Sequence, residues 1–286
     1  MPEAAPDGSP ADGGVAARAT FGVLDRWIGF WEAVFELVGA LYWLCRDTVS
    51  WAWRGFVLRQ VRIGSSAITA QIVRVGVRSI PIVMLVSGSI GIILALQTSP
   101  TLEQYGQTDK VANLIGVAVF RELGPLIAAI VMVGFAGASI AAELGTMVVG
   151  EEVEALEAMG LNPVRYLVVP RLAATVTSLV ALAVISDLTS VFFGMVLGTT
   201  ALGIPYDLYV SNTIAQLKMS DFLTGLLKAA VFGLLLGLIA CYNGLRVTGG
   251  AAGVGRATTE TVVQTVIFVI LSDLFFSTIF YAIGWT

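Results

Sequence analysis

Residues 80–97 read IPIVMLVSGSIGIILALQ and carry no charged side chain. A helix rises about 1.5 Å per residue, so this run can cross most of the roughly 30 Å of hydrocarbon in a bilayer. Pro81 fits the first turn of such a helix, where its missing N–H would have no partner. The stretch therefore predicts a membrane-spanning helix.

Four further apolar stretches follow it along the chain. They cover residues 123–142, 172–198, 222–245 and 261–285, and the first of these extends upstream through 115–122. The chain is 57% hydrophobic and 13% charged, whereas soluble domains carry about 25% charged residues. The sequence predicts an all-α integral membrane protein whose residues 79–286 form five transmembrane helices, with an outer loop running to Ser220.

The region before the first span has a different composition. Residues 1–20 are rich in Ala, Pro, Gly and Asp and predict a disordered cytoplasmic tail. Residues 21–78 predict amphipathic, interfacial helices, because Asp25, Glu32 and Glu36 fall on one side of a helix and tryptophans fall opposite. A tilted spanning helix with packed carboxylates is the alternative.

The basic residues predict the orientation, since loops on the cytoplasmic side are enriched in Lys and Arg. With the N-terminus inside, the outer loops hold only Lys110 and Lys218. The inner segments then hold Arg46, Arg54, Arg59, Arg62, Arg74, Arg78, Arg165, Arg171, Arg246 and Arg256. We therefore expect a cytoplasmic N-terminus and a C-terminus outside.

Composition also limits the function. The chain has no His, which excludes imidazole metal sites and Ser-His catalysis, and its net charge of −4 argues against a nucleic-acid partner. Gly250 and Gly255 have the spacing of a phosphate-binding loop, but Arg256 and Ala257 replace its Lys and its hydroxyl. We expect no catalytic residue, no metal site and no bound cofactor, and a cytoplasmic turn at these glycines.

An acidic stretch runs from Glu143 to Gly160, between the second and third spans. Leu156 stands one helical turn from Val153 and from Met159, which gives a small apolar strip among five carboxylates that we expect to have no cation to pair them. A solvated acidic helix is one interpretation. A helix that docks into a cleft of a cytoplasmic partner is the other, because it explains apolar residues on so exposed an element.

Five charged residues lie inside the predicted spans, namely Arg121, Glu122, Asp187, Lys228 and Asp273. Each costs roughly 2.5 to 3.5 kcal/mol at mid-bilayer, so each should face protein or a wet cavity and find a partner. Arg121 and Glu122 point about 100° apart on a helix, so we expect them to pair with Lys228 and Asp273 and not with each other. Structural pairing is one role, and gating or headgroup handling the other.

At the outer end of the first span, Leu94, Thr98, Leu102 and Tyr105 recur at helical spacing and define one face. It is either a packing face or a groove for acyl chains.

Several motifs resemble the MlaE/YrbE family of ABC transporter permeases. They are RELGPL from Arg121, AAELGTM from Ala141 leading to Glu151 and Glu152, ALEAMG from Ala155, the Pro170-Arg171 pair, and CYNGLRVTGGAAGVGRATT from Cys241. Together they extend the resemblance over about residues 79–277.

The resemblance implies a homodimer in the inner (cytoplasmic) membrane. Its partners would be a cytoplasmic ABC ATPase that uses ATP and Mg²⁺, an outer-side MCE-domain lipid-binding protein, and membrane lipid as cargo. It further implies a coupling helix that includes Glu143, Glu151, Glu152, Leu156 and Met159. The implied lipid pocket is lined by Leu94, Gln97, Leu102, Tyr105 and Leu123, and the implied intramembrane charges are Arg121, Glu122, Lys228 and Asp273.

Two other classes of function stay open at this point. An ion-coupled secondary transporter would use Glu122, Asp187 or Asp273 as a proton site, although the sequence shows no obvious inverted repeat. A non-transporting membrane scaffold would need no acidic docking helix.

Overall fold

The computed structural model describes residues 13–54 and 65–284, and every regular element within them is helical. The chain divides into two units, Met1–Trp43 and Leu44–Thr286. In the first unit, α1 (Gly13–Ala52) begins, and Glu32 and Glu36 are exposed on it. The predicted tail lies mostly outside the described residues, as does the side chain of Asp25. The interfacial helix and the predicted divisions at residues 20 and 78 stay predictions.

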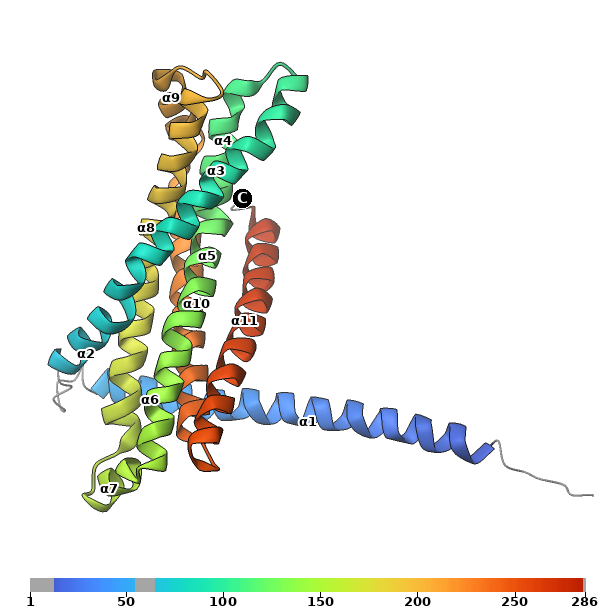
Figure 1. The fold of residues 1–286 in the computed structure, drawn as a ribbon, viewed down its shortest axis with the longest axis vertical. Helices are drawn as coiled ribbons and strands as arrows, with labels where there is room; N and C mark the ends of the chain where they lie inside the picture. The colour runs from blue at the N-terminus through green and yellow to red at the C-terminus, as the bar shows by residue number, and fades with distance from the viewer. Residues whose placement is uncertain (1–12, 55–64, 285–286) are drawn as a thin grey trace, which may run out of the picture. The chain divides into compact units, whose positions relative to one another are not determined.

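The second unit contains five helices that are long and apolar enough to cross a membrane, which confirms the predicted fold class (Figure 1). The first span contains α2 (Ser65–Gln71), η2 (Ile72–Gly76), η3 (Val77–Ser79) and α3 (Ile80–Gln104). The second contains η4 (Thr108–Lys110), α4 (Val111–Ala118), η5 (Val119–Leu123), α5 (Gly124–Met132), η6 (Val133–Gly137) and α6 (Ala138–Val149). The others are η7 (Val164–Val168) with α8 (Val169–Thr200), then α10 (Met219–Leu245) and α11 (Gly250–Ile283).

The helices extend beyond the predicted spans at several ends. The second span continues past residue 142 to Val149, because the charge of Glu143 is paired within the bundle and does not end the helix. The predicted outer loop contains a helix, α9 (Tyr206–Gln216). Pro205 immediately before it and Asp207 in its first turn are typical of a helix N-terminus and could have indicated it.

Helix α9 packs its one large buried side chain, Tyr209, against α8. A Cβ at Gly198 would lie 2.6 Å from the Tyr209 ring, so this contact requires a glycine. Burial raises the pKa of the Tyr209 phenol to about 12.

Helix α8 is the centre of the bundle and contacts α3, α5 and α10. Small residues bring α3 and α8 together: the Ser87 and Ser186 hydroxyls are 2.7 Å apart, and Ser190 Oγ donates to the Ser87 carbonyl at 2.8 Å. A Cβ at Gly91 would lie 2.0 Å from the Ser190 carbonyl oxygen. Close backbone approach of this kind is how helices associate in lipid, where burial of apolar surface gives little driving force between them.

The α3–α8 contact gives a prediction for Gly91→Ala. The added methyl collides with the backbone of Ser190, so the free energy of unfolding should fall by about 1–3 kcal/mol. The measurement is the thermal unfolding midpoint of the purified chain in detergent. Gly134→Ala is the matched control, because no atom lies within 4 Å of a Cβ there. Equal midpoints for the two variants would contradict the assigned contact.

Candidate functional site

Lys228 on α10 is the centre of a buried charge cluster. Its side chain has 0% exposure, and its Nζ lies 2.6 Å from Glu122 Oε2 on η5 and 2.9 Å from Asp273 Oδ1 on α11. Nζ also donates to Ser277 Oγ at 2.8 Å, and Ser277 in turn donates to Glu122 Oε1 at 2.8 Å. One cation thus joins two carboxylates from separate helices, and the cluster ties three spans together.

A second pair lies beside this cluster. Arg121 donates through Nε (3.1 Å) and Nη2 (2.7 Å) to Asp221 Oδ1, and Asp221 is buried. Arg121 and its neighbour Glu122 both lie in the π-helical turn η5, from which their side chains reach two positions of α10, Asp221 and Lys228. π-turns of this kind occur frequently at functional sites.

The expectation that Arg121 and Glu122 pair with other helices is confirmed, as is the contact of Glu122 with Lys228. The partner of Arg121 was missed. Asp221 precedes the apolar run that predicted the fourth span, yet the helix begins at Met219 and includes it. An acidic residue such as Asp221 is favoured in the first turn of a helix, and this preference could have indicated that the helix begins before it. In the structure the Asp221 carboxylate accepts a hydrogen bond from the Lys218 backbone N–H at 3.2 Å.

Asp187 on α8 behaves differently from the other predicted intramembrane charges. It is 2% exposed, no cation of the described residues pairs with it, and its Oδ1 has no hydrogen-bond partner. A Cβ at residue 124 would lie 1.6 Å from that oxygen, so only Gly124 fits beside it. Asp187 therefore faces protein as expected, but the expected partner is not found among the described residues.

The predicted helix from Glu143 to Gly160 is broken in the structure. Helix α6 ends at Val149, and α7 (Glu152–Ala158) follows a turn in which Glu151 has a φ of 60°. Glu143 lies on the span itself, and its two carboxylate oxygens pair with Arg74 Nη1 at 2.8 Å and Arg171 Nη2 at 3.1 Å. The expectation that no cation pairs with the carboxylates is thus wrong for Glu143, because arginines distant in sequence meet it in the fold.

Helix α7 also divides the predicted apolar strip. Val153 and Leu156 are partly buried against the core of the bundle, whereas Met159 is 66% exposed. The carboxylates of Glu151, Glu152, Glu154 and Glu157 are all on exposed residues. The surface that α7 offers to a partner is therefore Met159 with an acidic surround, and Leu156 faces the chain's own core.

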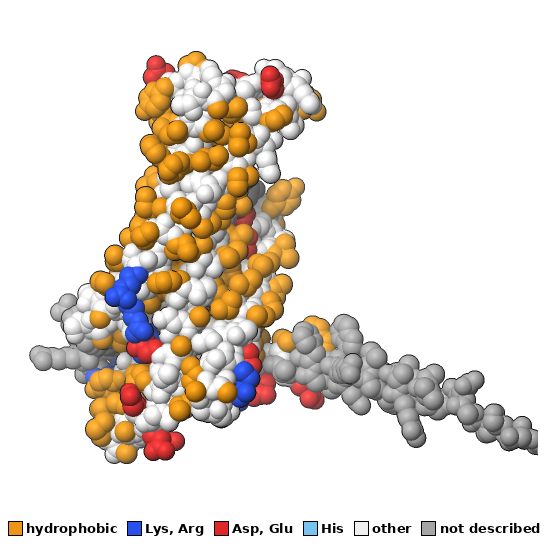
Figure 2. All heavy atoms as spheres, in the orientation of Figure 1, with side chains coloured by type: hydrophobic (Ala, Val, Ile, Leu, Met, Phe, Trp, Pro, Cys, Tyr) orange, Lys and Arg blue, Asp and Glu red, His pale blue; other side chains and the backbone are white. Residues whose placement is uncertain are grey.

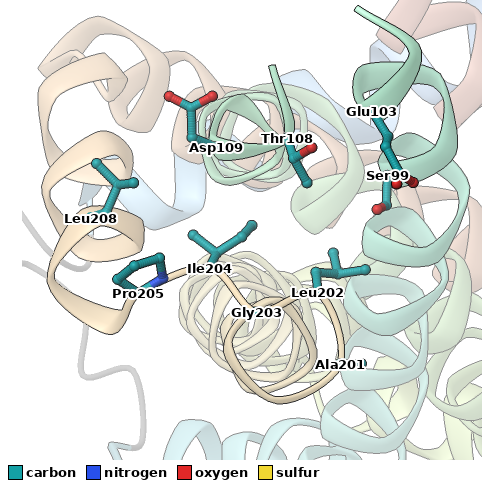
Figure 3. Close-up of a pocket in the computed structure, with 10 residues that line it drawn as sticks. All are labelled: Ser99, Glu103, Thr108, Asp109, Ala201, Leu202, Gly203, Ile204, Pro205 and Leu208. Carbon is teal, nitrogen blue, oxygen red and sulfur yellow. The ribbon is translucent and has the colours of Figure 1, made fainter. Parts of the chain in front are cut away.

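The five residues predicted to line a lipid pocket have different surroundings in the structure. Leu94 and Leu102 pack against a small cluster that includes Ala95 and Val111, while Gln97 and Tyr105 are exposed and Leu123 is half-buried in η5. A cavity of about 400 Å³ lies near them. It is lined by Ser99, Glu103, Thr108, Asp109, Ala201, Leu202, Gly203, Ile204, Pro205 and Leu208 (Figure 3). None of the predicted pocket residues is among them, so their role stays a prediction.

The cavity is formed by the end of α3, by η4 and by the connection from α8 to α9. Figure 3 shows Ser99 and Glu103 on one side, Pro205 and Leu208 on the other, and Ile204 between them. Its lining is partly acidic and partly apolar. No group of three or more His, Cys, Asp or Glu side chains with metal-binding geometry occurs in residues 31–54 and 66–284.

The Lys228 cluster gives a prediction of its own. Lys228→Met leaves two carboxylates without their cation in the bundle, so the free energy of unfolding should fall by roughly 3–5 kcal/mol. The loss of stability is measured by thermal unfolding in detergent. Lys110→Met is the control, because it removes a lysine that is exposed. Glu122→Gln combined with Lys228→Met should cost less than the sum of the two single variants. Additive costs would show that the two side chains act separately.

Comparison with known proteins agrees with this architecture. Residues 68–279 match the family described as Permease MlaE. The chain is 35% identical over 218 residues to a probable ABC transporter permease protein of Rickettsia prowazekii, a match that covers 76% of this chain and 84% of that protein. It is 32% identical over 218 residues to a probable ABC transporter permease protein of Synechocystis sp., covering 76% and 83%.

A third relative comes from a plant. Protein TRIGALACTOSYLDIACYLGLYCEROL 1, chloroplastic, of Arabidopsis thaliana is 30% identical over 211 residues, which are 74% of this chain and 60% of that protein. The family match covers all five spanning helices nearly completely. The chain therefore belongs to the MlaE family of ABC transporter permeases.

Proposed function

We propose that this permease moves phospholipid or a related apolar lipid between the inner membrane and an MCE-domain lipid-binding protein, with energy from a cytoplasmic ABC ATPase. The observation that carries the proposal is the combination of a five-span bundle with a short acidic helix, α7, exposed at one end. A permease of this family needs such a contact surface to receive force from an ATPase. The lipid part is supported by the plant relative, whose name refers to a glycerolipid.

The first span offers a surface for the cargo. Gln97 and Tyr105 are exposed near the end of α3, and Leu94 and Leu102 on the same stretch are partly exposed. An apolar face with a few polar groups is typical of ligand sites. We infer that a second copy of the chain completes the pocket, with Leu123 on its inner wall.

Membrane orientation belongs to the same proposal. The Arg74–Glu143–Arg171 network and α7 would lie at the cytoplasmic end, and α9 with the cavity beside it would lie outside. The C-terminus would then be outside, and ATP and Mg²⁺ would be used by the partner ATPase alone.

Asp187 favours a second candidate function, ion-coupled transport. A buried carboxylate that has no cation among the described residues and no hydrogen bond at Oδ1 is the kind of group that carries protons in membrane transporters. Under this alternative, Asp187→Asn would abolish transport, and transport would need no ATPase.

The experiment that separates the two reconstitutes the chain, its ATPase and an MCE-domain acceptor in phosphatidylcholine vesicles that contain a fluorescent phospholipid. We expect transfer of the labelled lipid only with hydrolysable ATP, and the same rate with a protonophore. Lipid extracted from the purified complex and identified by mass spectrometry defines the cargo class. Transfer that needs a proton gradient and no ATP would overturn the proposal.

The contact with the ATPase is tested at Met159. Met159→Arg places a cation on the exposed apolar end of α7, and co-purification of the ATPase should fall by at least about tenfold, as for an interface hot spot. Ile214→Arg is the matched control, because Ile214 is a 70% exposed apolar residue on α9. Leu156→Arg is less informative, since it also disturbs packing against the bundle. Normal co-purification with Met159→Arg would remove α7 from the ATPase contact.

A further inference from the structure

The network around Glu143 is short of negative charge. Arg171 is 6% exposed; its Nη1 donates to the Leu167 carbonyl at 2.9 Å and its Nη2 lies 3.1 Å from Glu143, but its Nε is buried without a hydrogen-bond partner. Arg74 takes the other Glu143 oxygen at 2.8 Å and keeps 44% of its side chain exposed. One carboxylate therefore serves two guanidinium groups, and both of its oxygens are used.

A third cation lies about one helical turn further along the first span. Arg78 follows Arg74 by four residues, across the π-turn η2 and the short η3, which keeps both on one side of the first span. Arg78 is exposed and forms no ion pair with the residues that the structure describes. Figure 2 shows basic side chains over the start of this span, beside an acidic one and among hydrophobic side chains. The surface here carries an uncompensated positive charge.

We infer that this charge lies at the border of the hydrocarbon layer, because a long uncharged stretch follows it. Val73 and Val77 beside the arginines are 53% and 50% exposed, so the described part of the chain leaves this face of the first span uncovered. From Ser79 to Leu102 the first span has no charged residue, and it includes strongly exposed apolar side chains such as Leu85. Arg74 and Arg78 therefore stand at the level of the lipid headgroups, at the arginine-rich end of the bundle.

We propose that Arg74 and Arg78 bind the phosphate group of an anionic lipid at this end of the bundle. A guanidinium offers several N–H donors in a plane that matches two phosphate oxygens, and the pairing is strongest where water is scarce. The ion pair with Glu143 orients the Arg74 side chain, and the buried Arg171 adds a second positive charge nearby. The site is on the outside of a single chain, so it stands whether or not lipid is also the cargo.

Native mass spectrometry of the purified full-length chain tests this site. The probes are dioleoyl phosphatidic acid and dioleoyl phosphatidylcholine, titrated separately into the detergent-solubilised protein. We expect phosphatidic acid to bind at least about tenfold more tightly, and Arg78→Gln to remove most of that preference, since a charge-assisted contact is worth about tenfold or more in affinity. Arg78 forms no ion pair in the described part of the chain, so this variant should keep the wild-type unfolding midpoint.

Two further arms make the result specific. Arg256→Gln on α11 removes an exposed arginine elsewhere and should leave the lipid preference unchanged. Inorganic phosphate at millimolar concentration should not displace phosphatidic acid. Equal loss of preference with Arg256→Gln would reduce the effect to net charge, and retained preference with Arg78→Gln would overturn the site. Displacement by inorganic phosphate would assign the site to a soluble anion and overturn the lipid assignment.

Discussion

The bundle depends on the burial of one ammonium group. A charge in a lipid-facing protein loses its hydration, and it is retained only where partners replace that hydration. Lys228 obtains these partners from η5 and α11 simultaneously, through Glu122, Asp273 and the bridging Ser277. This requirement fixes how the second, fourth and fifth spans stand against one another. Apolar packing alone would leave their rotation less well defined, since lipid tails compete for the same apolar surfaces.

The first and third spans pack closely because small residues line the contact between α3 and α8. Gly91 and the serines of α3 and α8 allow the two backbones to approach until hydroxyls on one helix reach the other. Gly124 on the second span also makes room for a close contact, because a side chain at position 124 would collide with the Asp187 carboxylate. Close contacts between small residues thus hold α3 against α8, the Lys228 cluster ties the second, fourth and fifth spans together, and α8 and α10 are in contact with each other.

The number and the order of the spans could be predicted because uncharged runs of this length have few alternatives in a chain so poor in charge. The pairing of Arg121 and Glu122 with other helices also followed from helical geometry. The ends of the helices and the partners of the ion pairs could not be predicted from the sequence. Asp221 and Glu143 stand just outside the apolar runs, and a hydropathy pattern cannot show that an arginine from a distant segment neutralises them. The break before Glu151 was missed although Gly150, which follows the last residue of α6, is a common helix-ending residue, while the positive φ of Glu151 itself could not be predicted.

That break bears on how force could pass from α7 to the spans. A continuous helix from Glu143 onward would carry any displacement of its end directly into the membrane. In the structure, the turn at Glu151 separates α7 from α6, and a left-handed conformation at a residue with a Cβ is costly enough to need support from its surroundings. The support available is the packing of Val153 and Leu156 on the core. Movement of α7 would therefore reach the bundle through these two side chains, while Glu143, held by Arg74 and Arg171, keeps the end of the second span in place.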